Sequence, residues 1–232
     1  MALSYVPVAQ RDEATRSDFI VKVYQHLLLA VAAFVGIEAL LFRLGVAKGI
    51  YDFISQGGVA WLLLLGGFMI GSWLATNAAH DLGDTQRQYM GLFGLAALEA
   101  LIFAPFLYLF FEVVDGSSTV WAAAVITGIG FAGLSAVAYT TRKDLSFLRP
   151  LVMWGMVGGL VLIVAAVLFG LNLGVWFSVG MIVLAGTSIL YKTQQIIRHF
   201  PAEAYVGASV QLFASLMLLF WYVLRLLGQV RR

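Results

Sequence analysis

The sixth apolar stretch of the chain, residues 176–197, reads WFSVGMIVLAGTSILYKTQQII. Its length and apolar character predict a membrane-spanning helix. The first charge in it is Lys192, one to two turns before the predicted end of the helix near Arg198. Two placements of Lys192 are open, because its long stem can carry the ammonium group to the lipid headgroups, or the side chain can point into a helix bundle and meet a carboxylate.

The composition extends this prediction to the whole chain. Hydrophobic residues make up 62% of it and charged residues 11%, which leaves too little polar surface to cover a water-soluble domain. The mean hydropathy of +0.94 agrees. The sequence therefore predicts an all-α membrane protein with several spans.

Several functional classes are disfavoured by residue content. The chain has no cysteine and three histidines that are far apart, so no disulfide, metal site or cofactor is expected. A net charge of +2 disfavours a nucleic-acid partner. No GxSxG, HExxH or phosphate-binding glycine loop occurs, so the protein is not expected to be an enzyme.

Seven apolar stretches each approach the roughly 20 residues that a helix needs to cross about 30 Å of hydrocarbon. They predict one seven-helix transmembrane domain over residues 21–228, with spans at 21–44, 59–77, 89–111, 120–140, 147–170, 175–198 and 204–227. Residues 1–20 are polar and lack the periodicity of a packed helix, so they are expected to form a flexible tail. Ser17 is predicted to cap a helix that begins near Asp18.

Basic residues predict the orientation. Seven spans place nine Lys and Arg on one side (Arg11, Arg16, Lys22, Arg87, Arg142, Lys143, Arg149, Lys192, Arg198) and five on the other (Arg43, Lys48, Arg225, Arg231, Arg232). Because the richer side faces the cytoplasm, the N-terminus is predicted to be cytoplasmic and the C-terminus periplasmic. A re-entrant last stretch would instead divide the same residues twelve to two.

Two glutamates fall inside predicted spans, where a lone charged carboxylate costs several kcal/mol. Glu38 is in the outer part of the first span and is expected to reach the outer interface. Glu99 is near the middle of the third span, and its side chain is too short to reach either interface. Its axial offset from Lys192 is roughly 7 Å at 1.5 Å per residue, and Ser215 has a similar depth to Glu99. Glu99, Lys192 and Ser215 are therefore a candidate intramembrane polar cluster.

Four motifs resemble a known family. Residues 140–148 read TTRKDLSFL and resemble the Thr-Arg-x-Asp-x-Ser-Phe loop of the Bax inhibitor-1 family, especially its bacterial YccA-like branch. The matching loop residues are Arg142, Lys143, Asp144 and Ser146. Similar matches are Glu99 with the Ala-Pro pair at 104–105, LYKTQ at 190–194 for Leu-Tyr-Asp-Thr-Gln, and LRLLG at 224–228 for Leu-Arg-x-Leu-Gly.

The resemblance implies a Bax inhibitor-1 type bundle of seven helices whose last helix is central. It also implies two activities. One is a pH-sensitive Ca²⁺ leak channel gated by two aspartates, but Lys192 and Ser215 occupy those positions here, and a lysine repels Ca²⁺. The other is a substrate and modulator of the protease FtsH. The latter is favoured, and a channel or small-ion transporter that uses Glu99 is the alternative.

The favoured activity predicts a location and partners. The protein is expected in the bacterial inner membrane, within the lipid bilayer, with FtsH and its associated membrane proteins as partners. A protease that pulls membrane proteins into a cytosolic chamber needs an unfolded polar segment to begin. The tail at residues 1–18 is predicted to be that segment.

Overall fold

The computed structural model covers all 232 residues and describes residues 6–114, 116–141 and 143–230. Its long helices are α1 (Glu13–Arg43), α3 (Gly58–Ala79), α4 (Thr85–Tyr108), α5 (Ser117–Thr140), α6 (Leu148–Phe169), α7 (Gly174–His199) and α8 (Tyr205–Val230). Shorter elements are η1 (Val8–Gln10), α2 (Val46–Ile54), the π-helical turn η2 (Leu109–Val113) and η3 (Ala202–Ala204). Within these described residues, seven helices are long and apolar enough to cross a membrane, as the sequence predicted.

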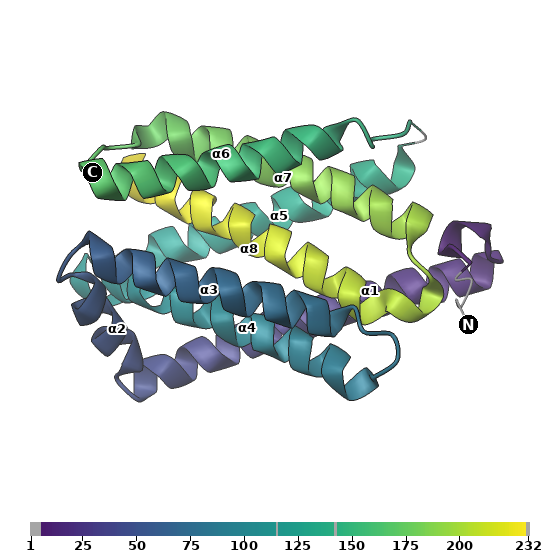
Figure 1. The fold of residues 1–232 in the computed structure, drawn as a ribbon, viewed down its shortest axis with the longest axis horizontal. Coiled ribbons are helices and arrows are strands. Elements are labelled where there is room, and N and C mark those ends of the chain that lie inside the picture. Colours follow the sequence, from purple (N-terminus) through teal and green to yellow (C-terminus); the bar gives the residue numbers. More distant parts are fainter. Residues whose placement is uncertain (1–5, 115, 142, 231–232) are drawn as a thin grey trace.

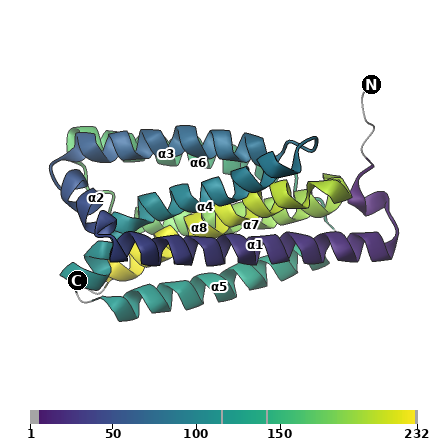
Figure 2. The ribbon, with the colours of Figure 1, turned by 90° about the horizontal axis from the view of Figure 1, so that it is seen from below.

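The helices form three layers (Figure 1, Figure 2). In Figure 2, α3 and α6 lie on one side, α4, α7 and α8 in the middle, and α1 and α5 on the other side. Helix α8 packs against α1, α3, α4, α5 and α7. In the most apolar windows of α4 and α8, 56% of residues are buried, against 6% in α3 and α6. The last helix is therefore central, and α3 and α6 face lipid.

Small residues allow the close approach of α3, α4 and α8. A Cβ atom on Gly91 of α4 would collide with the backbone oxygen of Ala75 in α3. One on Gly207 of α8 would lie 3.0 Å from the backbone oxygen of Ala79. Because apolar contact alone does not drive helices together in lipid, such backbone proximity is a main source of packing energy.

Helix α2 (Val46–Ile54) was not predicted from the sequence. It lies between α1 and α3, packs against α4 and buries Ala47. A helix of nine residues is too short to cross a membrane. The prediction of spans from long apolar stretches therefore left these residues in a connection between the first two spans.

The N-terminal region also differs from the prediction. Helix α1 begins at Glu13 and is capped by Asp12, whose side chain accepts from the Thr15 backbone amide at 3.1 Å. Ser17 lies inside the helix and is not its cap. The amide and the hydroxyl of Thr15 both donate to Asp12, and these bonds lower the pKa of its carboxyl group. The prediction of a flexible tail over residues 1–20 is therefore wrong for residues 13–20, which are helical.

A docked segment precedes α1. The Val8 side chain is 0% exposed and belongs to the main hydrophobic core. Its backbone amide donates to the carbonyl of Phe200 at 2.8 Å, and Pro7 forms a β-bridge with Pro201. Residues 7–10, which we call the N-terminal strap, therefore lie on the connection between α7 and α8. Residues 1–5 of the predicted tail are outside the described part of the chain.

Candidate functional site

Lys192 of α7 points toward the backbone of α8. Its Nζ atom donates to the carbonyl oxygen of Gln211 at 3.4 Å. The hydroxyl of Ser215 donates to the same carbonyl at 3.1 Å, and Ser188 of α7 is 3.2 Å from the Ser215 hydroxyl. Two of the three predicted cluster residues, Lys192 and Ser215, therefore meet on one backbone oxygen.

The Gln211 side chain extends this network to the end of α3. Its Nε2 atom lies 2.9 Å from Nε2 of His80, and His80 Nδ1 lies 2.7 Å from the carbonyl oxygen of Thr76. A carbonyl can only accept, so Nδ1 carries a proton and Nε2 accepts from the Gln211 amide. The polar network thus joins α3, α7 and α8.

The sequence motifs did not point to His80, Ser188 or Gln211 as site residues. A usable signal was present, because Ser188 and Lys192 are four residues apart on α7, and Gln211 and Ser215 are four apart on α8. Residues at that spacing share one helix face. Two polar pairs in neighbouring spans are a sign that the two faces meet.

Glu99 takes no part in these contacts. It is 6% exposed on α4, and within the described residues its carboxyl group has no hydrogen bond or ion pair. Helix α8 lies between α4 and α7, as Figure 1 shows, and the Lys192 side chain ends on it. The pairing of Glu99 with Lys192 is therefore not formed here, and a functional role for the three residues stays a prediction.

Glu38 is a second buried carboxyl group, and the expectation that it reaches the outer interface is wrong. It is 6% exposed, and neither side-chain oxygen has a hydrogen-bond partner among the described residues. The cause is its place on the inward face of α1, whose buried residues recur every three or four positions (Phe19, Val23, Leu27, Ala30, Phe34, Glu38).

The family-motif loop is fixed to α7 by Gln194. The amide nitrogen of Gln194 donates to the Lys143 carbonyl at 2.7 Å, and its oxygen accepts from the Leu145 amide at 2.6 Å. Arg198 also donates to the Lys143 carbonyl, at 3.2 Å. The loop between α5 and α6 is therefore attached to α7 at Gln194, two residues after Lys192 in the sequence.

Within this loop, Asp144 and Ser146 form a local turn. The carboxylate of Asp144 accepts from the hydroxyl of Ser146 at 2.6 Å and from its backbone amide at 2.9 Å. These bonds lower the pKa of Asp144. Arg142, the other predicted motif residue, lies outside the described residues. The motif acts structurally through Asp144, Ser146 and the backbone of Lys143.

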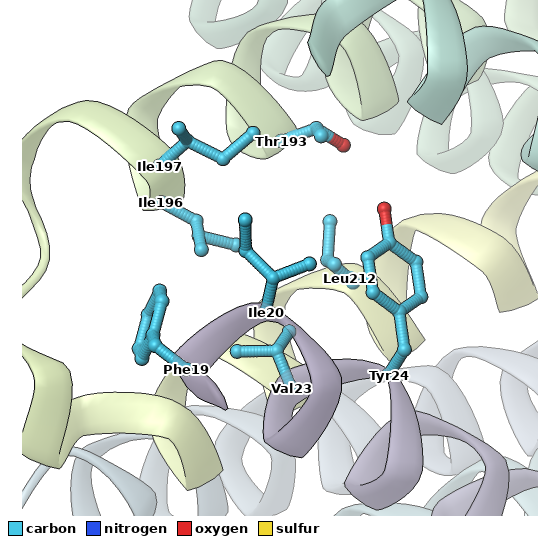
Figure 3. A pocket seen from close by; sticks show the side chains of 8 residues that line it. All are labelled: Phe19, Ile20, Val23, Tyr24, Thr193, Ile196, Ile197 and Leu212. Carbon is cyan, nitrogen blue, oxygen red and sulfur yellow. The ribbon is translucent and has the colours of Figure 1, made fainter. Parts of the chain in front are cut away.

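A small cavity lies beside the network, between α1, α7 and α8 (Figure 3). Its volume is about 10 Å³, and its wall is mostly apolar, with Phe19, Ile20 and Val23 on one side. The hydroxyl groups of Tyr24 and Thr193 lie at the same edge of it. The Thr193 oxygen is buried and has no hydrogen-bond partner in the described chain. The space is on the order of a single water molecule.

The fold and this network define a polytopic α-helical membrane protein with a polar contact between its last two spans. The chain belongs to the Bax inhibitor-1 family, because the family profile described as "Inhibitor of apoptosis-promoting Bax1" matches residues 16–232. The family resemblance inferred from the sequence motifs is thereby confirmed.

Curated bacterial relatives agree with this assignment. The chain is 31% identical to an uncharacterised protein of Pseudomonas aeruginosa over 59% of this chain and 61% of the relative. It is 36% identical to a protein of Escherichia coli strain K12 named "Modulator of FtsH protease YccA", over 46% of this chain and 48% of the relative. A membrane protein of Vibrio cholerae is 29% identical over 53% and 56%. Each match spans less than two thirds of the relative.

Proposed function

We propose that this protein is an inner-membrane modulator of an FtsH-type protease, which it engages as a slowly processed substrate. The likeness to the Escherichia coli relative named as a modulator of FtsH carries the proposal. The match covers under half of each chain, so the activity of that relative is an expectation for this one. The seven membrane-spanning helices provide the lipid-embedded body on which such a partner would act.

The N-terminal strap supports slow processing. With the N-terminus in the cytoplasm, as the distribution of basic residues predicts, a protease would have to detach Val8 from Phe200 before it could pull on α1. Burial of a valine side chain is worth about 1.5 to 3 kcal/mol and a hydrogen bond about 0.5 to 1.5 kcal/mol. The detached form would therefore be a minor population, which would limit the rate of engagement.

The experiment that tests the proposal follows the degradation of a second membrane substrate of FtsH. Cells that overproduce this protein should degrade that substrate more slowly, and the protein itself should have a longer half-life when the protease is inactive. Degradation at the same rate with and without the overproduced protein would contradict modulation. Site-specific crosslinking to FtsH would separate a direct effect from an indirect one.

Transport of a small cation is the second candidate, and the buried carboxyl groups favour it. Glu38 and Glu99 are buried and have no partner among the described residues, and such intramembrane carboxyl groups are typical of ion and proton pathways. The ammonium group of Lys192 in the polar network disfavours Ca²⁺ relative to H⁺. Liposomes that contain the protein should then pass H⁺ and little Ca²⁺. A Ca²⁺ leak that depends strongly on pH would instead support the leak-channel activity of the family.

A further inference from the structure

An open hollow lies at the end of the bundle where α6 and α8 end. Its volume is about 330 Å³. The start of α3 contributes Trp61, the end of α6 contributes Ile163 and Val167, the turn between α6 and α7 contributes Asn172, and α8 contributes Arg225. One part of the wall is apolar, and the other carries an amide and a guanidinium group. The wall of the hollow therefore suits an amphiphilic molecule, which has one apolar and one polar part.

Arg225 is the charged group of this hollow. Its guanidinium carbon lies 5.5 Å from the centre of the Phe177 ring, which orients the group by a cation–π contact. Within the described residues, the side chain makes no hydrogen bond and no ion pair with a carboxylate. The five N–H donors of its guanidinium group thus have no partner in the part of the chain that the structure describes, and the group is only partly buried.

The depth of Arg225 matches the boundary between headgroups and hydrocarbon. It stands five residues before Val230, the last residue of α8, which is about 7.5 Å along the helix axis. Asn172 lies in the short turn between the two apolar helices α6 and α7. Trp61 stacks on Trp221 at 6.0 Å, and tryptophan rings prefer this interfacial level. The neighbouring helices α3 and α6 face lipid, so a lipid molecule can enter from the side.

We propose that the hollow binds an anionic phospholipid, with its phosphate group on Arg225 and an acyl chain along Trp61, Ile163 and Val167. Charge complementarity supports this occupant, because guanidinium groups bind phosphate oxygens through paired hydrogen bonds. An acyl chain fits the apolar wall. The volume of the hollow falls in the range of small-molecule sites.

The test is native mass spectrometry of the delipidated full-length protein in detergent, with dioleoyl phosphatidylglycerol as the probe. Arg225→Gln should weaken binding by roughly tenfold, because a charge-assisted contact is lost. Ala166→Phe, which adds bulk to the wall and keeps the charge, should also weaken it. Arg43→Gln is the matched control, because Arg43 is an exposed arginine in the last turn of α1, at the same end of the bundle.

The outcomes separate the sources of phosphate. Binding of phosphatidylglycerol that exceeds binding of dioleoyl phosphatidylcholine and survives excess inorganic phosphate supports a lipid site. Equal binding by Arg225→Gln and Arg43→Gln overturns the proposal, as does displacement of the lipid by inorganic phosphate alone. Thermal unfolding of each variant verifies folding. If Arg225→Gln does not fold, Ala166→Phe decides the question, and undiminished binding by it contradicts the site.

Discussion

Lys192 on α7 and Gln211 on α8 are joined by an ammonium group that donates to a backbone carbonyl at 3.4 Å. The same carbonyl accepts from Ser215. Because a main-chain oxygen cannot titrate, this contact between the last two spans persists at any pH at which the lysine is charged. A pair of carboxylates in its place would change with pH.

Double-mutant cycles should therefore show coupling within the network and none to Glu99. Lys192→Met and Ser215→Ala share the Gln211 carbonyl, and we expect a coupling energy of about 0.5 to 3 kcal/mol between them. Lys192→Met and Glu99→Gln share no partner, so their effects should add within about 0.5 kcal/mol. Unfolding in detergent measures both cycles. Strong coupling of Glu99 to Lys192 would mean that the two meet in a state other than this one.

Glu38→Met should stabilise the fold. The substitution replaces a buried carboxyl group that has no described partner with an apolar side chain of similar length, and removal of such a group is worth about 1 to 3 kcal/mol. Thermal unfolding measures the gain. Glu112→Met, at an exposed position of η2, is the control and should change stability little. A loss of stability in Glu38→Met would reveal a partner for this carboxyl group.

Gln194→Ala should release the motif loop from α7. Two hydrogen bonds to the backbone of Lys143 and Leu145 are lost, at a cost of about 1 to 3 kcal/mol in total. Hydrogen exchange of residues 143–147 measures the effect. Gln195→Ala, one position along, removes an amide for which no such bond is described and should leave exchange unchanged. Equal exchange in the two variants would contradict the role of Gln194.

The turn at Asp144 should be stable at neutral pH and lost in acid. Hydrogen bonds from Ser146 lower the pKa of the Asp144 carboxyl group below its ordinary 3.8, so the folded state favours the carboxylate. Its contribution is present above pH 3.8 and disappears as the pH falls through the lower value of the folded protein. The amide shift of Ser146 in an NMR titration should follow this midpoint. Asp144→Asn should abolish the transition, and a midpoint above 3.8 would contradict the hydrogen bonds.

Val8→Asp should detach the N-terminal strap and shorten the half-life of the protein in cells that contain FtsH. A buried charge opposes docking, because Val8 is 0% exposed. Ala9→Asp adds the same charge at the exposed neighbour and is the control. A chase of both variants, with and without active protease, measures the effect. If the two half-lives agree in the presence of FtsH, the strap does not control engagement.

The seven spans were predictable because each is a long apolar run, and such runs need no tertiary information. The docking of Val8 on Phe200 could not be predicted from the sequence, because residues so distant in the chain meet only in the folded bundle. The direction of Lys192 was also undetermined. Depth along a helix follows from the rise per residue, whereas the face that a side chain occupies depends on the rotation of each helix about its axis.

The central position of α8 has a consequence for biosynthesis. The ribosome makes α8 after the other six spans, so these spans enter the membrane before the helix that most of them pack against exists. Until then His80 and Lys192 lack the α8 groups that they contact in the finished protein. Assembly of the bundle is therefore a late event, and a chain that stops before Tyr205 leaves polar groups in lipid, where a surveillance system could recognise it.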